Sequence, residues 1–424
     1  MSRASTIIIG AGAAGLAAAA RLTESGEMPL ILEARDRIGG RVHTVRDPQW
    51  PLPLELGAEF IHGWPKETWE IVREAGLSAY DVTNEHWMSR GGKPRKDGKE
   101  WEAVEGLMQR LARVPKSDWT FNEFLRRRCR DLPASVRSMA RAFVEGLDAA
   151  DADRVSARSI RQSEQAGEKI EADTPFRIID GYDGVLRRIR QKLPDDRIQL
   201  NTIVRTIRWS RGRVTIEAAA GQSFTAQRAI ITLPIGVLRS GDVMFDPPLP
   251  SRMSDAIDAM RMGPVVKVLL RFRRAIWEDG PWRDLSFAHR PGAVFPTWWT
   301  MSPLRLPLLT AWAGGPAASA MSHRSEADVL ADALRTLQQL IGIRAAKLRD
   351  ELLAWHVSDF QADRYSRGAY AYTFAGGSEI VGRLANPIDG TLYFAGEATH
   401  PGYAGTVAAA IASGYRAAKQ IAGG

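Results

Sequence analysis

The feature that most constrains this chain is a glycine-rich turn near its start, in the stretch TIIIGAGAAGLAAAARL. Residues Thr6 to Ile9 are β-branched and predict a short buried strand. Gly10, Gly12 and Gly15 follow with the spacing GxGxxG, and the alanine-rich residues Leu16 to Leu22 predict a helix. A strand before and a helix after this spacing indicate the first unit of a dinucleotide-binding α/β fold.

Each part of this motif has a physical role toward a pyrophosphate. Gly10 permits the tight turn, Gly12 lets the backbone approach the phosphates, and Gly15 lets helix and strand pack closely. The helix N-terminus offers free N–H groups and partial positive charge. Glu33 ends a second predicted strand, PLILEA, 18 residues after Gly15. A carboxylate there accepts hydrogen bonds from both ribose hydroxyls, so the sequence predicts dinucleotide binding.

A second glycine pair distinguishes between the two common dinucleotides. In ARDRIGGRVHT, Gly39 and Gly40 allow a close backbone approach, and the Arg41 guanidinium can bind phosphate oxygens in a bidentate manner. A Gly-Gly-Arg so soon after the ribose acid is not part of the simple NAD fingerprint, so it favours FAD. The alternative is a solvent-exposed glycine turn.

Length and composition limit the other possibilities. The 424 residues exceed what one hydrophobic core usually serves, so we expect two domains. Cys129 is the one cysteine and the seven histidines do not cluster, so we predict no disulfide and no metal site. The net charge of +8 comes mostly from scattered arginines, and no run of 18 apolar residues exists. We therefore expect neither nucleic acid nor a membrane as partner, and a cytoplasmic chain that starts at Met1 or Ser2.

The C-terminal stretch GTLYFAGEATHPGYAGTVAAAIASGYRAAKQIAGG repeats the strand-to-helix pattern. Residues Thr391 to Ala395 predict a strand, and Gly396 and Glu397 follow it, where ligands bind in open α/β sheets. Thr406 and Val407 begin a helix of small residues. A helix that starts beside a flavin stabilises negative charge on the ring, so the first and last segments should form one domain.

The stretch RMGPVVKVLLRF, residues 261 to 272, carries one lysine in a run typical of a strand. With a period of two, Val266, Val268 and Leu270 lie on one face and Lys267 lies on the other. Taken alone, the stretch favours a half-solvated strand with its basic side chains in water, and a lysine with a function is the second interpretation.

Seven stretches together resemble the flavin-containing amine oxidases, the superfamily of monoamine oxidases, polyamine oxidases and flavin-type histone lysine demethylases. They cover essentially the whole chain: IIIGAGAAGLAAA, LEARDRIGGRVHT, LELGAEFIHG, AIITLPIGVLRSGDVMFDPPLP, MGPVVKVLLRF, DRYSRGAYAYTFAGG and YFAGEATHPGYAGTVAAAIASGYRAA. The resemblance implies an α/β fold in which a Rossmann-like FAD-binding domain is interleaved with an α+β substrate-binding domain. The FAD-binding domain would take residues 1–80, 178–250 and 380–424, and the substrate-binding domain residues 81–177 and 251–379.

The resemblance also implies catalytic roles. In this family the lysine of the KVxLxF strand approaches flavin N5, usually through a water, and Lys267 occupies that place. Desolvation would lower its pKa, so that it could help deprotonate the amine or position oxygen and water. Tyr370 of SRGAYAYTF and Tyr403 of HPGYAGTV resemble the aromatic pair that flanks the substrate amine. The substrate-binding residues implied in the same way are His62 and Trp298 or Trp299.

The same resemblance assigns the cofactor and its contacts. FAD would be non-covalent, because Ala369 stands where monoamine oxidases carry a cysteine joined to the flavin. Phe360 replaces a tryptophan that is usual nearby. LGAEFIHG lacks the arginine that L-amino-acid oxidases of the superfamily carry soon after ELGA to pair the substrate carboxylate, which favours an amine without a carboxylate. The expected FAD contacts are Gly10, Gly12, Ala14, Gly15, Glu33, Ala34, Arg35, Gly40, Arg41, Gly57, Ala58, Val204, Gly396, Glu397, Thr406 and Val407.

The predicted activity is FAD-dependent oxidative deamination of a primary or secondary amine, either a polyamine or an aryl- or alkylamine. The product would be an imine or aldehyde, with O2 reduced to hydrogen peroxide. One alternative is an FAD-dependent desaturase or porphyrinogen-type oxidase, which would be expected to lack the lysine and the paired tyrosines. Another is a non-catalytic FAD-binding or chromatin-interaction protein. The identity of the amine and the oligomeric state stay open.

Overall fold

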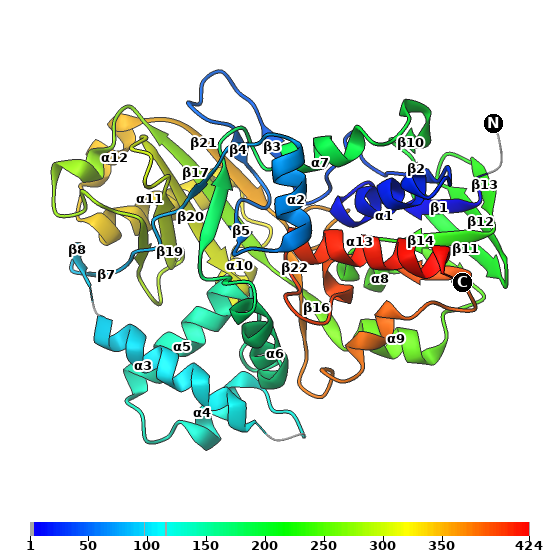
Figure 1. Cartoon of the computed structure of the whole chain (residues 1–424). Helices are drawn as coiled ribbons and strands as arrows, with labels where there is room; N and C mark the ends of the chain where they lie inside the picture. The colour runs from blue at the N-terminus through cyan, green and yellow to red at the C-terminus, as the bar shows by residue number, and fades with distance from the viewer. Residues whose placement is uncertain (1–3, 97, 115–116, 424) are drawn as a thin grey trace.

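A computed structural model describes residues 4–96, 98–114 and 117–423. A parallel sheet with two long helices lies at one end of the molecule, and a larger mixed sheet lies at the other (Figure 1). A group of helices from the first half of the chain extends below the mixed sheet. Both chain termini lie at the end that carries the parallel sheet.

The N-terminal strand forms as predicted and lies at the centre of a five-stranded parallel sheet. The order is β10-β2-β1-β14-β23. The strands are β10 (Ile198–Gln199), β2 (Leu30–Leu32), β1 (Thr6–Ile9), β14 (Arg228–Ile231) and β23 (Leu392–Phe394). Segments from the start, middle and end of the chain therefore share one sheet, as the α/β prediction required.

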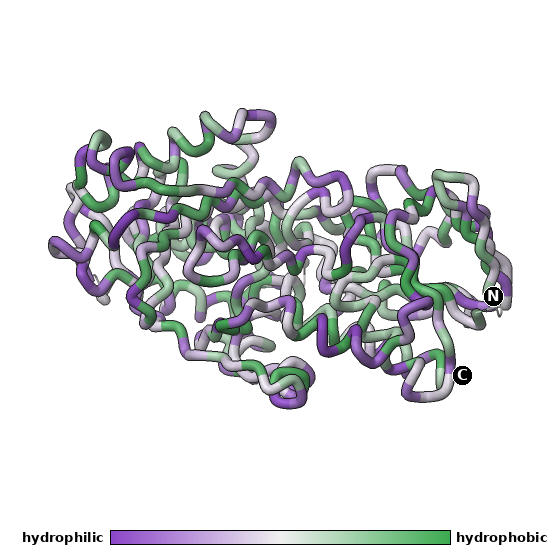
Figure 2. The backbone as a smooth tube through the Cα atoms, turned by 90° about the horizontal axis from the view of Figure 1, so that it is seen from above, coloured by the Kyte–Doolittle hydropathy of each residue, from purple (hydrophilic) through white to green (hydrophobic). Residues whose placement is uncertain are grey.

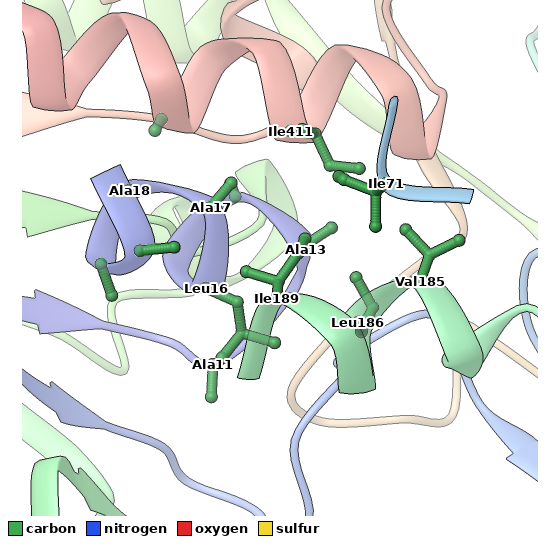
Figure 3. Close-up of a cluster of buried hydrophobic side chains, with 14 of the residues drawn as sticks. Ala11, Ala13, Leu16, Ala17, Ala18, Ile71, Val185, Leu186, Ile189 and Ile411 are labelled. Carbon is green, nitrogen blue, oxygen red and sulfur yellow. The ribbon is translucent and has the colours of Figure 1, made fainter. Parts of the chain in front are cut away.

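Two helices of small residues pack together beside this sheet. Helix α1 (Ala13–Glu24) and helix α13 (Val407–Ala422) lie side by side (Figure 1). A Cβ added to Gly414 of α13 would lie 2.3 Å from the carbonyl oxygen of Ala14, so the two backbones approach closely. Figure 3 shows Leu16 and Ala17 of α1 and Ile411 of α13 near side chains of α7 (Asp183–Arg190) in one buried cluster.

A four-stranded sheet flanks the parallel one, in the order β13-β12-β11-β15. Its strands are β13 (Ser223–Ala226), β12 (Arg213–Ala218), β11 (Val204–Ser210) and β15 (Met244–Asp246). Along β12 buried residues alternate with more exposed ones, which is the pattern of a sheet with one wet face. The register of β11 shifts between Val204 and Thr206, so the start of this strand departs from the regular ladder.

The lysine strand lies inside a seven-stranded mixed sheet, in the order β21-β17-β20-β19-β18-β7-β8. The strands are β21 (Leu352–Asp359), β17 (Val265–Phe272), β20 (Leu308–Gly314), β19 (Thr297–Thr300), β18 (Phe287–His289), β7 (His86–Arg90) and β8 (Lys93–Arg95). Val266, Val268 and Leu270 face a core that α11 (Glu326–Ile341) covers, as the alternation predicted. The prediction of a half-solvated strand is wrong, because Lys267 is 1% exposed beneath the segment around Glu55.

The helical part of the chain forms its own core. It contains α3 (Gly98–Gln109), α4 (Phe121–Arg128), α5 (Ala134–Leu147) and α6 (Ala157–Glu168). Cys129 is buried in this core. Figure 2 shows hydrophobic stretches through the interior and hydrophilic ones on many outer loops. The division into an FAD-binding and a substrate-binding domain stays a prediction.

None of the helices in the described ranges is both long and apolar enough to cross a membrane. Across the same ranges, no group of three or more His, Cys, Asp or Glu residues is arranged to hold a metal ion.

Candidate active site

A cavity of about 850 Å³ lies where the parallel sheet and the mixed sheet meet. Gly10 and Glu33, at the carboxyl ends of β1 and β2, line one part of it. Lys267 and Trp299, from β17 and β19, line another part. One continuous space therefore joins the predicted dinucleotide site to the predicted catalytic residues, and ligand sites often occupy such a position between layers.

The glycine turn has the geometry of a phosphate site. Gly10 has φ +105°, a conformation that side-chain-bearing residues rarely adopt. A Cβ on Gly12 would meet no atom within 4 Å and would project into the cavity that this residue lines. A Cβ on Gly15 would lie 1.9 Å from the Gly10 carbonyl oxygen, so Gly15 serves helix–strand packing and does not line the cavity. The space above the turn is open to a ligand phosphate.

The carboxylate of Glu33 is fixed at the end of β2. One oxygen accepts the Ala11 N–H at 2.7 Å and the other accepts the Arg35 N–H at 2.9 Å. Glu33 is 6% exposed and lines the cavity. Because each carboxylate oxygen has two lone pairs, both can still accept a ribose hydroxyl.

An ion pair closes the cavity wall between distant segments of the chain. Arg41 contacts a carboxylate oxygen of Glu397 at 2.8 Å and donates to the Ala369 carbonyl at 2.6 Å. The other Glu397 oxygen accepts the Gly405 N–H at 3.1 Å. Arg41 thus already has partners, and its predicted contact with phosphate stays a prediction.

All the expected FAD contacts except Gly15 line the cavity. Thr406 is the N-cap of α13, and its hydroxyl accepts the Ala409 N–H at 3.0 Å. The positive end of α13 therefore faces this space. Sequence reasoning missed further lining residues, among them Thr202, Thr232, Pro234 and Tyr365.

Lys267 is held by a buried charge network. Its ammonium donates to the Glu55 carbonyl oxygen at 2.6 Å and to the Glu59 carboxylate at 2.6 Å. The second Glu59 oxygen accepts from Arg177 Nε at 2.7 Å and from Trp299 Nε1 at 3.1 Å. Burial by itself would raise the pKa of Glu59, but the charges of Lys267 and Arg177 outweigh it and hold the pKa at about 2. Glu59 is ionised at neutral pH.

The two predicted tyrosines both line the cavity. The Tyr370 hydroxyl donates to the Leu147 carbonyl, and the ring lies against the backbone of Gly405. Burial raises the pKa of Tyr370, so the phenol stays neutral. Tyr403 packs on His400 with a ring-centroid distance of 4.3 Å.

The strand alternation of β19 separates the two tryptophans. Trp299 lines the cavity, whereas Trp298 is fully buried in the core behind the sheet and donates to the Phe295 carbonyl. The structure therefore places Trp299, and not Trp298, in the predicted substrate pocket. His62 of β5 (Ile61–His62) also lines the cavity, and burial lowers its pKa.

A carboxylate that no motif indicated lies in the cavity wall near Tyr370. Asp148, at the C-terminus of α5, makes no side-chain hydrogen bond or ion pair within the described ranges of the chain. Burial raises its pKa to about 7. Burial and the charge of Asp148 also raise the pKa of Glu164 in α6 to about 7. Asp173 lines the same cavity.

A neutral aromatic wall lines another part of the cavity. His86 and His289 stack with ring centroids 5.1 Å apart and ring nitrogens at 2.8 Å. Phe287 stacks on His86 at 4.9 Å, and Trp101 meets it edge-on at 5.5 Å. Burial lowers the pKa of both histidines, that of His289 to about 3, so both rings are uncharged at neutral pH.

Comparisons with known proteins agree with this arrangement. The model of the flavin-containing amine oxidoreductase family matches residues 13–422. Polyamine oxidase 2 of Arabidopsis thaliana is 30% identical over 98% of this chain and 87% of its own length. Lysine-specific histone demethylase 2 of Homo sapiens is 27% identical over 99% of this chain. The chain spans about half, 53%, of the length of that demethylase.

The solved structures are similar in fold. Wild-type putrescine oxidase bound to putrescine matches with a TM-score of 0.84 at 23% sequence identity. The match covers 100% of this chain and 99% of that one. At this identity the likeness shows the fold alone, and it confirms the predicted α/β class.

Proposed function

The chain belongs to the flavin-containing amine oxidoreductase family and is therefore an enzyme, and we propose that it oxidises a diamine or polyamine with non-covalently bound FAD. The one observation that carries the substrate class is Asp148, a carboxylate without a protein partner in the cavity wall near Tyr370. Asp148 is half-buried, and a carboxylate that is partly removed from water is costly unless it meets a cation. The second ammonium group of a diamine or polyamine would supply that cation.

The residues present fit FAD. The open space above Gly12 would receive the pyrophosphate, Glu33 the adenosine ribose, and the start of α13 the pyrimidine side of the flavin. When bound, the flavin supplies two-electron oxidation of the C–N bond and passes the electrons to O2, giving hydrogen peroxide. The chain itself binds and orients the substrate and excludes water.

The aromatic side chains would orient the amine. Tyr370 and Tyr403 would flank the reacting nitrogen, and His62 and Trp299 would close the pocket around it. Because the phenol of Tyr370 stays neutral, its ring presents an uncharged aromatic face to the amine.

A non-covalent cofactor follows from the residue at position 369. Ala369 has no thiol to bond to the flavin, and Cys129 is buried in the helical core. We expect acid precipitation of the holoenzyme to release all of its flavin into the supernatant. Flavin that stays with the precipitated protein would contradict this proposal.

A second candidate substrate, an aryl- or alkylamine, is favoured by the neutral wall of His86, His289, Phe287 and Trp101. Such an uncharged wall accommodates an apolar substrate group well, since an apolar group needs no ionic partner. The desaturase and porphyrinogen-type alternatives are disfavoured, because a purely hydrophobic substrate would leave Asp148 without a cation.

The test is a peroxide-coupled screen of the flavin-loaded enzyme. Putrescine, spermidine and spermine are compared with benzylamine, tyramine and amino acids. Higher kcat/KM for the diamine and polyamines supports the proposal, and preference for benzylamine or tyramine supports the second candidate. If the flavin-loaded enzyme produces no peroxide with any of these amines, both candidate substrate classes are wrong.

A further inference from the structure

The 55–59 segment places one carboxylate against Lys267 with little freedom to move. A Cβ on Gly57 would lie 1.9 Å from the Arg41 carbonyl oxygen, and the Ala58 N–H donates to the same oxygen at 3.1 Å. This close backbone contact fixes the segment that carries Glu55 and Glu59. Glu59 itself is held by two further side chains, Arg177 and Trp299.

We infer that Glu59 is a positioning residue that keeps Lys267 protonated and directs its ammonium group at the flavin. An ammonium has three N–H donors, and two are already bonded, to the Glu55 carbonyl and to Glu59. The third N–H is the one available to the cavity that Lys267 lines. The inference rests on the proposed function, since it assumes that the flavin binds there.

The charges around Lys267 favour the protonated, ammonium form of its side chain. An isolated lysine that is 1% exposed would tend to lose its proton to escape the cost of burying a charge. A carboxylate at 2.6 Å reverses that preference, because Coulomb attraction is strong where water is excluded. The other ionisable groups nearby are Glu55 and, beyond Glu59, Arg177, while the cross-strand neighbours Trp312 and Ser358 are uncharged.

The consequence concerns the direction of proton transfer. A charged Lys267 can donate a hydrogen bond to water, oxygen or the flavin, but it cannot take a proton from the substrate amine. This differs from the expectation that desolvation would make Lys267 a base. The amine would instead have to reach the site already neutral.

The test replaces Glu59 by glutamine in the flavin-loaded enzyme. In Glu59→Gln an amide oxygen can still accept from Arg177 and Trp299, but Lys267 loses its anion, so it should lose its proton at a lower pH than in the parent. The flavin absorption spectrum should then show a pH-dependent transition in addition to any that the parent enzyme shows. Above that transition kcat should fall by about 10- to 100-fold, the effect of losing one charge-assisted hydrogen bond.

Three matched variants test whether the spectral transition comes from Lys267. Adding Lys267→Met to Glu59→Gln should remove it, and adding Lys267→Arg should leave a permanent charge and a flat pH profile. Glu55→Gln should not create the transition, because the Glu55 side chain bonds to Thr44 and the Tyr182 N–H and its loss leaves the Lys267–Glu59 ion pair in place. A transition that persists without Lys267 would overturn the inference.

The spectral titration needs bound flavin but no substrate, so its result does not depend on which amine, if any, is oxidised. If no amine is oxidised but the transition appears, the proposed activity fails and the role of Glu59 stands. Identical spectra and pH profiles in Glu59→Gln and parent enzyme would refute the role of Glu59. Should Glu59→Gln not fold, Glu59→Asp, whose shorter side chain lengthens the ion pair, should give a transition at higher pH.

Discussion

At the scale of single residues, the cavity contains two carboxylates with opposite behaviour. Glu59 has two cationic partners, and its pKa is about 2. Asp148 has none within the described ranges, and burial raises its pKa to about 7. The first is therefore a fixed charge, whereas the second becomes charged most readily when a cation binds beside it.

Substitution of Asp148 should change which amines are bound. In Asp148→Asn we expect KM for putrescine and spermidine to rise by about 10- to 100-fold, since a charge-assisted contact contributes about 1.5–3 kcal/mol. The KM for benzylamine should stay within about twofold. Steady-state peroxide kinetics measure both values, and an equal change for all three amines would contradict a cation subsite.

The pH dependence of stability gives a second test of the same residue. The pKa of Asp148 is raised from 3.8 to about 7 in the folded chain, so the unfolded state loses this proton first as the pH rises. Its contribution to stability is therefore complete below pH 3.8, falls between pH 3.8 and about 7, and is constant above. Between pH 5 and 7 the Tm of the apoprotein should decrease less in Asp148→Asn than in the parent. Equal slopes would contradict the raised pKa.

The sequence predicted those site residues whose geometry depends only on their neighbours in the chain. The glycine turn, Glu33 and the start of α13 are each recognisable from a short stretch, because neighbouring residues dictate their geometry. Glu59 and Asp148 could not be predicted in this way. Their significance comes from Lys267 and Tyr370, which lie more than 200 positions away in the sequence.

At the scale of elements, the packing around the parallel sheet depends on how closely α1 and α13 approach each other. Both helices were predicted from their small residues, and Figure 3 shows Ala13 and Ala17 of α1 in the same buried cluster as Ile411 of α13. The sequence also predicted the alternation of β17. The stretch taken alone could not predict that both faces of β17 are covered, because the covering segments come from distant parts of the chain. Only the family resemblance implied a desolvated Lys267.

A methyl group between these helices should be costly. In Gly414→Ala the new Cβ would lie 2.3 Å from the Ala14 carbonyl oxygen, so α13 must shift. We expect a loss of about 1–3 kcal/mol in the free energy of unfolding and weaker FAD binding. Denaturant unfolding and flavin titration measure these changes.

A glycine in an open helical position provides the control for this prediction. Gly106 of α3 has no atom within 4 Å of an added Cβ. Gly106→Ala should therefore stabilise the chain slightly, by about 0.5–1 kcal/mol, through helix propensity. If both alanine variants behave alike, close packing of α1 on α13 is not what requires Gly414.

At the scale of the whole molecule, the cavity joins walls from the start, middle and end of the chain. The Arg41–Glu397 pair and the Arg35–Asp363 pair, at 2.8 and 2.6 Å, connect these walls. A ligand that fills the cavity would therefore stabilise several distant segments at once. By mass action, FAD at about 100 times its Kd would add about 2.7 kcal/mol to the free energy of unfolding.

Hydrogen exchange on FAD-loaded and FAD-free protein would map that stabilisation. Backbone N–H groups at the start of α1 have no helical acceptor, and Gly12 provides no side-chain cap, so they should exchange quickly without cofactor. Loading with FAD should slow exchange at residues 10–14, 33–41, 57–58, 202–204 and 396–407 together, since all of these contribute to the cavity wall. Helix α11, which contributes nothing to that wall, should exchange at the same rate in both forms. Protection confined to residues 10–41 would mean that the cofactor touches only the N-terminal unit, and the proposed position of the flavin between the two sheets would then be wrong.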